Sequence, residues 1–255
     1  MLGVNLAWHQ ISFKKFCRFN LISPKIIKTV KVAVIVFPGS NCDRDMHHVL
    51  TDVFHLNSQL VWHTDDLPKN IDAIVLPGGF SYGDRLRAGV IAAYSPVIKD
   101  VKKMAEKGMP ILGVCNGFQI LVESGLLPGA LLRNTSLNFM CKWTEIIVKN
   151  NTTPFTNRFK LNQRIPIAIA NGEGRYYADK KTLESLKKNN QIVFTYAERI
   201  NGASMDIAGI CNKAGNVVGM MPHPERSAEQ IINPNNAKPA SLIFESLLNT
   251  LGVIA

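Results

Sequence analysis

The sequence has no long apolar segment, although 46% of its 255 residues are hydrophobic. No run approaches the roughly 20 uninterrupted apolar residues that a membrane-spanning helix needs. We therefore predict no membrane segment. The charged fraction of 19% is typical of a globular enzyme, and the length is enough for one large domain with a sizeable core.

Cysteine is scarce as well. The five cysteines include no CxxC pair, which argues against a disulfide framework and against a cysteine-rich zinc site. The glycine patterns of nucleotide-binding loops, GxGxxG and GxxxxGK[ST], are also missing. We therefore expect a cytoplasmic protein with no metal site and no cofactor of its own.

Acidic residues are absent from the first 31 positions, which carry six basic ones. The rest of the chain holds 23 basic against 19 acidic residues, so most of the net charge of +10 lies in this tail. A nucleic-acid-binding protein would instead gather basic and aromatic residues on its folded body, and we predict no nucleic-acid partner. Residues 1–30 are interpreted as an N-terminal extension: a poorly ordered segment, a targeting sequence or a partner-binding arm.

The remaining chain, residues 31–255, reads as a single α/β domain. The segment 31–37 (KVAVIVF) is almost entirely apolar and β-branched, as expected for a buried parallel strand, and Pro38-Gly39 ends it. Strands are also predicted at 60–62, 71–76, 110–114, 143–148, 165–170, 192–196, 205–211 and 217–221. Helices are predicted from a cap at Ser40 or Asn41 to Leu50, over 84–107 with a break near 95–96, and at 116–123, 180–188 and 238–248.

This alternation predicts a doubly wound, mostly parallel sheet flanked by helices. In such sheets, ligands bind at the carboxyl ends of the strands. The loops 38–41, 77–84 and 114–117 leave three of these ends and are rich in glycine and small polar residues. We therefore expect them to converge on one site.

A cysteine stands between two glycines in Gly113-Val114-Cys115-Asn116-Gly117. This G-x-nucleophile-x-G pattern is typical of a strained strand-to-helix turn that lifts the nucleophile above the sheet. The helix that follows would stabilise a thiolate, and the Asn116 N–H would be one oxyanion donor. The alternative is a buried structural cysteine in front of an ordinary helix.

A base for this thiol is predicted at His223, which follows the strand 217–221 in Met221-Pro222-His223-Pro224-Glu225. Glu225 could hold the far ring nitrogen and orient the imidazole. Pro224 and Glu225 alone would also fit a capped helix start, but that leaves a histidine at the end of a buried strand unexplained. Together the two segments predict a triad of Cys115, His223 and Glu225.

Paired glycines also occur in the segment 77–84, PGGFSYGD. Glycines at a strand end allow a backbone to approach a ligand closely and to donate N–H groups to it. A plain turn is the alternative interpretation of this segment.

Seven motifs together resemble one family. The sequence is similar to the class I glutamine amidotransferases and, among them, to the glutaminase subunits of phosphoribosylformylglycinamidine synthase. The resemblance covers about residues 31–250, and implies a flavodoxin-like fold. It is carried by FPGSNCDRD (37–45), LPGGFSYGDRLRAG (76–89), GVCNGFQIL (113–121), LLRNTSLNFMCKW (131–143), NGEGRYY (171–177), IAGICN (207–212) and GNVVGMMPHPER (215–226).

The resemblance implies a role for each matching residue. Cys115 would attack the side-chain amide of L-glutamine to form a thioester, with His223 as base and Glu225 as its orienting group. The N–H groups of Gly79 and Asn116 would form the oxyanion hole. The implied substrate contacts are Gln119, Arg133, Asn134 and Ser136.

The resemblance also implies partners. Ammonia would pass to a synthetase subunit, which binds ATP and Mg²⁺ and converts formylglycinamide ribonucleotide to formylglycinamidine ribonucleotide in purine biosynthesis. A small third subunit would bridge the two.

The sequence departs from the family pattern at three positions: Asn171 replaces the usual histidine, Arg85 follows Asp84, and Ala88 stands where a cysteine is common. Two alternatives remain open, namely an intracellular-peptidase-like cysteine protein on a related fold and a non-catalytic docking module.

Overall fold

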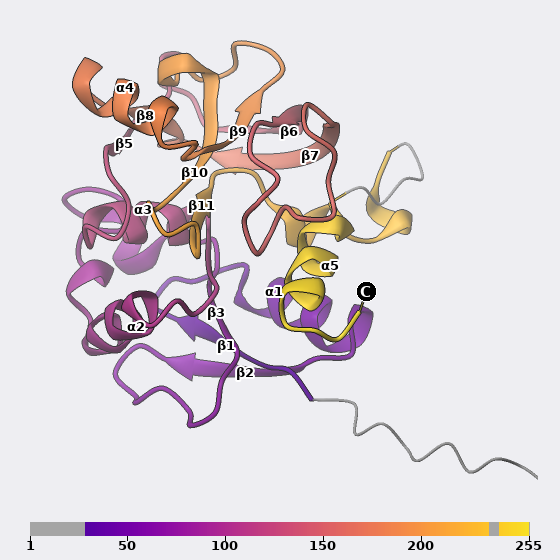
Figure 1. The fold of residues 1–255 in the computed structure, drawn as a ribbon. Helices are drawn as coiled ribbons and strands as arrows, with labels where there is room; N and C mark the ends of the chain where they lie inside the picture. Colours follow the sequence, from indigo (N-terminus) through magenta and orange to yellow (C-terminus); the bar gives the residue numbers. More distant parts are fainter. Residues whose placement is uncertain (1–28, 235–239, 255) are drawn as a thin grey trace, which may run out of the picture.

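The computed structural model describes residues 29–234 and 240–254, in which nine strands form one sheet and two more form a small second sheet (Figure 1). The large sheet has the order β2-β1-β3-β4-β11-β10-β9-β6-β7. Its strands are β1 (Lys31–Val36), β2 (Asn57–Trp62), β3 (Ala73–Leu76), β4 (Ile111–Val114), β6 (Met140–Val148), β7 (Arg164–Asn171), β9 (Ile192–Tyr196), β10 (Ile207–Cys211) and β11 (Val217–Met220). The small sheet pairs β5 (Ala130–Leu132) with β8 (Arg175–Tyr177).

Five α-helices accompany these strands in the described residues: α1 (Asp43–His48), α2 (Pro96–Glu106), α3 (Asn116–Glu123), α4 (Lys180–Lys188) and α5 (Ser241–Thr250). A π-helical turn, η1 (Val49–Val53), continues α1. Short 3₁₀ turns are η2 (Ser81–Asp84), η3 (Ala92–Tyr94), η4 (Ser204–Asp206), η5 (Pro224–Arg226) and η6 (Gln230–Ile232).

The half of the sheet that carries the predicted site is parallel. β2, β1, β3, β4 and β11 all run in the same direction, and every residue of β3, β4 and β11 is buried. Helices cover both faces of this half, with α2 and α3 on one side and α1 and α5 on the other (Figure 1). Strands covered on both faces must be apolar throughout. The doubly wound parallel sheet predicted from the sequence is thus confirmed.

The other half, from β10 to β7, is antiparallel. Buried residues alternate along β7, as in a strand with one face on the core. The sequence predicts these strands but not their direction. β5 and β8 were not predicted, since each has only three residues.

Strand register places three strand ends side by side. Leu76 at the end of β3 is level with Gly113 of β4, and Met220 at the end of β11 is level with Val114. The loops that follow β3, β4 and β11 therefore begin next to one another at one edge of the sheet.

Two predicted helices differ from the structure. The predicted helix over 84–107 shrinks to α2 and the short turns before it, because Asp84, Leu86 and Gly89 have positive φ angles that interrupt a helix. The cap predicted at Ser40 or Asn41 is also wrong: the N-cap of α1 is Cys42, and the Ser40 hydroxyl accepts a hydrogen bond from the Phe37 N–H.

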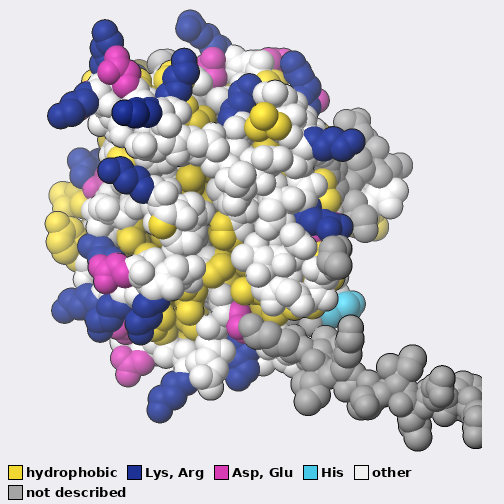
Figure 2. All heavy atoms as spheres, in the orientation of Figure 1, with side chains coloured by type: hydrophobic (Ala, Val, Ile, Leu, Met, Phe, Trp, Pro, Cys, Tyr) yellow, Lys and Arg dark blue, Asp and Glu magenta, His cyan; other side chains and the backbone are white. Residues whose placement is uncertain are grey.

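The predicted N-terminal extension, residues 1–30, lies outside the described residues except for its last two positions. Val30 belongs to the folded body, where it is buried and its carbonyl accepts a hydrogen bond from Asn57. None of the helices in the described part of the chain has the length and apolar character needed to span a membrane. On the face shown in Figure 2, lysine and arginine side chains are spread around the margin and do not form one patch.

Candidate active site

The predicted nucleophile occupies a strained turn between β4 and α3. Cys115 has φ 51° and ψ −106°, a backbone conformation that residues other than glycine rarely adopt. The glycines on either side are sterically required: a Cβ at Gly113 would lie 2.7 Å from the carbonyl oxygen of Gly117, and one at Gly117 would lie 1.9 Å from that of Leu76. The tight turn expected from the sequence is therefore present.

The Cys115 thiol points toward the end of β7. Its Sγ lies 3.6 Å from the carbonyl oxygen of Ala170, and the residue is 6% exposed. The backbone of Cys115 is held by the neighbouring strand, because its N–H donates to the carbonyl of Met220. The thiol is thus fixed at the meeting point of β4, β7 and β11.

His223 and Glu225 are fully buried and directly paired. The Nδ1 atom of His223 lies 2.6 Å from Oε1 of Glu225, and the backbone N–H of His223 donates to Ala168 in β7. The other ring nitrogen, Nε2, has no hydrogen-bond partner in the described structure. This arrangement leaves Nε2 available to exchange a proton.

The electrostatics around His223 favour its charged form. Burial by itself would lower the pKa of His223, but the Glu225 carboxylate and, next, the Cys115 sulfur outweigh burial and hold that pKa well above its usual value. His223 and Cys115 therefore interact electrostatically.

Gly78, in the loop after β3, leaves room for this pair. A Cβ on Gly78 would lie 2.7 Å from Cε1 of His223 and 3.1 Å from Sγ of Cys42. The same Cβ would lie 3.4 Å from Cβ of Cys115. The three side chains therefore surround the space that a side chain at position 78 would fill.

The three loops predicted to converge are hydrogen-bonded to one another. The N–H of Asn41 donates to the carbonyl of Gly78, and the N–H of Phe80 donates to that of Gly39. Gly79, one of the predicted oxyanion donors, has φ 152°, and a Cβ there would lie 2.7 Å from the backbone of the 39–41 segment. Glycine is needed at position 79 for this close approach.

Asn116, the second predicted oxyanion donor, begins α3. The first N–H groups of a helix have no carbonyl one turn earlier and are free for a ligand. The Asn116 side chain is buried and used otherwise: Oδ1 accepts from the N–H of Ser81 at 3.1 Å, and Nδ2 donates to Gln119 at 2.9 Å. It connects the nucleophile turn to the loop after β3.

A cavity of about 210 Å³ opens beside these groups. It is lined by Asn41, Cys42, Gly79, Phe80, Asp84, Cys115, Gln119, Phe139, Cys141, Ala170, Asn171, Gly172, Glu173, His223 and Arg226. Its size suits a small polar molecule.

The predicted substrate contacts lie in different places. Gln119 lines the cavity, although its Nε2 already donates to the carbonyl of Glu173 at 2.8 Å. Arg133 is mostly exposed, and its Nε lies 3.6 Å from Oε1 of Glu173, outside the cavity lining. Ser136 is exposed, and its hydroxyl accepts from the N–H of Asn138.

Asn134, another predicted substrate contact, pairs with neighbouring backbone groups. Its side chain is completely buried, and Nδ2 donates to the carbonyls of Asn138 and Asn171. Its Oδ1 accepts from the N–H of Gly174. With both ends of its amide occupied, Asn134 holds the 171–174 segment in shape.

Asn171 was noted in the sequence only as a departure from the family pattern. It lines the cavity, is 3% exposed, and neither its Nδ2 nor its Oδ1 has a hydrogen-bond partner in the described structure. An unpaired buried amide costs roughly 1–3 kcal/mol. Such a group in a cavity wall can pair with a polar molecule that enters the cavity.

The carboxyl groups of Asp84 and Glu173 also face the cavity. Burial, and then the nearby Glu173 carboxylate, raise the pKa of Asp84 to about 6. Sequence reasoning did not assign either residue to the site, since nothing in the local pattern shows that 84 and 173 meet.

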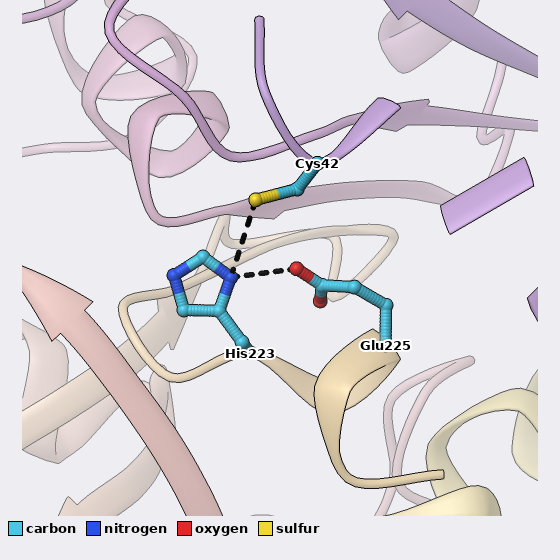
Figure 3. A group of neighbouring side chains, drawn as sticks. All are labelled: Cys42, His223 and Glu225. Carbon is cyan, nitrogen blue, oxygen red and sulfur yellow. Dashed lines mark hydrogen bonds and ion pairs between the residues drawn. The ribbon is translucent and has the colours of Figure 1, made fainter. Parts of the chain in front are cut away.

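Cys42 was likewise not assigned. Figure 3 shows its sulfur and the Glu225 carboxylate approaching the same nitrogen of His223 from two sides. Together, Cys42, His223 and Glu225 offer three metal-ligand atoms within 4.8 Å of one another.

Comparison with known proteins agrees with this geometry. Residues 29–249 match the family described as CobB/CobQ-like glutamine amidotransferase domain. A chain in the structure of PurLQS from Thermotoga maritima is 45% identical, with a TM-score of 0.79, and the match covers 88% of this chain and 99% of that one.

Two more distant structures share the fold alone. A glutamine amidotransferase from Thermotoga maritima is 16% identical over 89% of this chain and 99% of its own, with a TM-score of 0.58. The glutaminase domain of CTPS from Trypanosoma brucei, solved with bound acivicin, is 14% identical over 87% of this chain and 94% of its own, with a TM-score of 0.55.

Proposed function

The chain belongs to the CobB/CobQ-like glutamine amidotransferase family, and from this we propose that it is the glutaminase subunit of phosphoribosylformylglycinamidine synthase. It hydrolyses L-glutamine to glutamate and supplies the ammonia to an ATP-dependent synthetase subunit in purine biosynthesis. The observation that carries the proposal is the buried His223–Glu225 pair beside the strained Cys115 turn. The resemblance to PurLQS supports the choice of pathway.

The first half-reaction uses the thiolate–imidazolium pair. The Cys115 sulfur attacks the carboxamide carbon of glutamine, and the carbonyl electrons move onto oxygen. The N–H groups of Gly79 and Asn116 donate to this oxyanion. His223 transfers its Nε2 proton to the amide nitrogen, the carbon–nitrogen bond breaks, and ammonia leaves the γ-glutamyl thioester.

The second half-reaction restores the enzyme. His223, now neutral, takes a proton from water as the water oxygen attacks the thioester carbon. The carbon–sulfur bond breaks, glutamate is released, and the thiolate again faces the imidazolium. Glu225 holds Nδ1 throughout, which fixes the orientation of the ring.

The cavity walls hold the rest of the substrate. The unpaired Asn171 amide forms hydrogen bonds with the bound glutamine, and these bonds offset the free-energy cost of burying the amide. Asp84 and Glu173 place negative charge on the side of the cavity that suits the α-ammonium group.

The synthetase subunit docks at the mouth of this cavity. Phe80 and Phe139 line the cavity, are 43% and 52% exposed, and have ring centroids 6.1 Å apart. Leu86 and Leu137, in neighbouring loops, are 93% and 77% exposed. Exposed hydrophobic groups around a cavity are typical of an interaction surface.

The remaining assignments follow from this role. ATP and Mg²⁺ are bound by the synthetase, a small subunit bridges the two, and the complex is cytoplasmic. The free chain hydrolyses glutamine only weakly, because the 80–86 loop, with its positive φ angles at Tyr82 and Asp84, is organised by the synthetase.

The test is ammonia release from glutamine by the purified chain, alone and with its synthetase partner. We expect activity that rises with the partner and disappears in Cys115→Ala. Equal activity with and without the partner would contradict the proposed organisation of the loop. No release under any condition, with Cys115 also unreactive toward a glutamine-like alkylating agent, would leave a docking module as the better interpretation.

A further inference from the structure

The proposed mechanism gives no task to Cys42, although its sulfur touches the machinery. Cys42 is the N-cap of α1, lines the cavity and is 2% exposed. Its Sγ lies 3.9 Å from Nδ1 of His223, the nitrogen that faces Glu225 and not the one left free for proton exchange (Figure 3). A second thiol therefore lies behind the imidazole.

The three atoms have nearly the spacing of metal ligands. Zinc binds sulfur at about 2.3 Å and nitrogen or oxygen at about 2.0 Å, so tetrahedral ligands lie roughly 3.5 Å apart for sulfur and nitrogen and roughly 3.3 Å for nitrogen and oxygen. Here the sulfur–nitrogen distance is 3.9 Å and the nitrogen–oxygen distance is 2.6 Å. The sulfur and the nitrogen would have to approach by about 0.4 Å and the nitrogen and the oxygen to separate by about 0.7 Å, and all three ligand atoms already lie within 4.8 Å of one another.

One more ligand atom is available beside these three. The second carboxylate oxygen of Glu225, Oε2, is buried and has no hydrogen-bond partner in the described structure, so it is available as a further ligand. One thiolate and one carboxylate would balance a divalent ion. Burial raises the pKa of the Cys42 thiol, whereas His223 and Arg226, whose Nη2 lies 3.0 Å from the Cys42 sulfur, act in the opposite direction. The ion must therefore displace a thiol proton when it binds.

We propose that Cys42, His223 Nδ1 and Glu225 form an inhibitory site for a zinc-like divalent cation, distinct from any site at the Cys115 thiol. Binding displaces the thiol proton of Cys42 and the Nδ1 proton of His223 to solvent, and forms one metal–sulfur, one metal–nitrogen and one metal–oxygen bond. The ion enters through the cavity, which both Cys42 and His223 line.

Inhibition follows because the metal coordinates atoms that the catalytic residues need. With Nδ1 and Glu225 bound to the ion, the carboxylate no longer orients the imidazole, and the ring no longer carries the charge that pairs with Cys115. Binding of the metal does not depend on the proposed glutaminase reaction, but the loss of activity rests on it. The two are therefore tested separately.

The binding test uses the full-length chain carrying Cys115→Ala, which removes the nucleophile thiol and leaves the proposed ligands. We expect one Zn²⁺ per chain by equilibrium dialysis, and with Co²⁺ a thiolate-to-cobalt charge-transfer absorption. Adding Cys42→Ser should abolish that absorption and weaken Zn²⁺ binding by at least about 100-fold, since losing even an outer-shell partner costs 10–100-fold.

The matched control is Cys115→Ala with Cys141→Ser, because Cys141 is the third thiol in the cavity wall and is exposed. This variant should bind the metal as Cys115→Ala does. Cys42→Ala is a second replacement in case serine disturbs folding, and circular dichroism checks both. The proposal is overturned if Cys115→Ala binds no zinc, or if binding survives in folded chains that lack Cys42.

The inhibition test compares each variant with its own zinc-free rate of glutamine hydrolysis. Zn²⁺ should inhibit the unmodified chain at concentrations at least about 100-fold lower than it inhibits Cys42→Ser. Equal sensitivity would assign the inhibition to Cys115 with the free Nε2 of His223 and overturn the proposed inhibitory role. A chain that binds zinc at Cys42 but hydrolyses no glutamine would contradict the proposed function alone.

Discussion

The side-chain oxygen of Asn116 accepts a hydrogen bond from the backbone N–H of Ser81 at 3.1 Å. Asn116 follows the nucleophile, and Ser81 belongs to the loop that carries the proposed oxyanion donor Gly79. A single buried side chain thus couples the position of the thiol to the position of the loop.

Replacing this coupling side chain should reduce activity more than stability. Asn116→Ala keeps the backbone N–H but releases Ser81 and Gln119, so we expect kcat for glutamine with the synthetase partner to fall by about 10-fold or more, with a stability loss of about 1–3 kcal/mol. Asn216→Ala is the matched control, because the Asn216 amide is also buried and donates to the Ala105 and Met109 carbonyls. Equal loss of kcat in both variants would reject the coupling.

Glu225→Gln should change both activity and the pH dependence of stability. The carboxylate helps to hold the pKa of His223 well above 6.5, so the charged imidazole contributes stability that is complete below about pH 6.5 and is lost as the pH rises through the higher folded-state pKa. Urea unfolding between neutral and alkaline pH should show this decline in the unmodified chain and a weaker one in Glu225→Gln. The rate of hydrolysis should fall by about 10²–10⁴-fold. An unchanged pH slope would contradict the assigned role of Glu225.

Asn171→Leu should stabilise the free chain and weaken substrate binding. The variant removes two unpaired buried polar atoms, so we expect a higher Tm without glutamine and a KM raised by about 10-fold. Asn201→Leu is the control, since the amide of Asn201 is paired with Gly174 and Ala203 and its loss should lower Tm. A lowered Tm in Asn171→Leu would show that the amide is not unpaired in solution.

Asp84→Asn should stabilise the folded chain, and the gain should depend on pH. Because the pKa of Asp84 is raised to about 6, its ionisation opposes folding: the stability present below pH 3.8 is lost as the pH rises through about 6. The difference in free energy of unfolding between Asp84→Asn and the unmodified chain should grow from pH 4 to pH 7. A difference independent of pH would rule out this origin.

Gly78→Ala should remove activity through its single added methyl. That carbon would lie 2.7 Å from the His223 ring, so the imidazole must shift from its position. Gly172→Ala is the control, because its added carbon meets only Phe139, at 3.6 Å. We expect hydrolysis to be lost in Gly78→Ala, with far-ultraviolet circular dichroism unchanged, and largely kept in Gly172→Ala.

The parallel strands and the convergence of three loops were predictable because each depends on a continuous segment of the sequence. The run 31–37 and its terminating Pro-Gly specify a strand and its end, and strand ends in a doubly wound sheet lie at one edge. The same reasoning brought Cys115 and His223 to one place, although they are 108 positions apart in the sequence.

What the sequence could not show were contacts made by single side chains across long separations. Cys42 reaches His223 over 181 positions, and the buried amide of Asn134 is paired with the 171–174 segment. No local pattern in the sequence shows that residues so far apart are paired. The order of the antiparallel strands is likewise set by packing, because the alternation of apolar and polar residues along a strand does not specify which strand pairs with it.

The backbone at position 115 has an evolutionary consequence. Its φ of 51° and ψ of −106° lie in a region that glycine adopts with less strain than any other residue. A variant with glycine at position 115 would therefore fold at least as readily as the chain with cysteine. Selection for a stable fold therefore does nothing to retain the thiol. A descendant that no longer needs the ammonia can lose catalysis through one substitution and still fold. A cysteine at position 115 therefore indicates that selection for activity has continued.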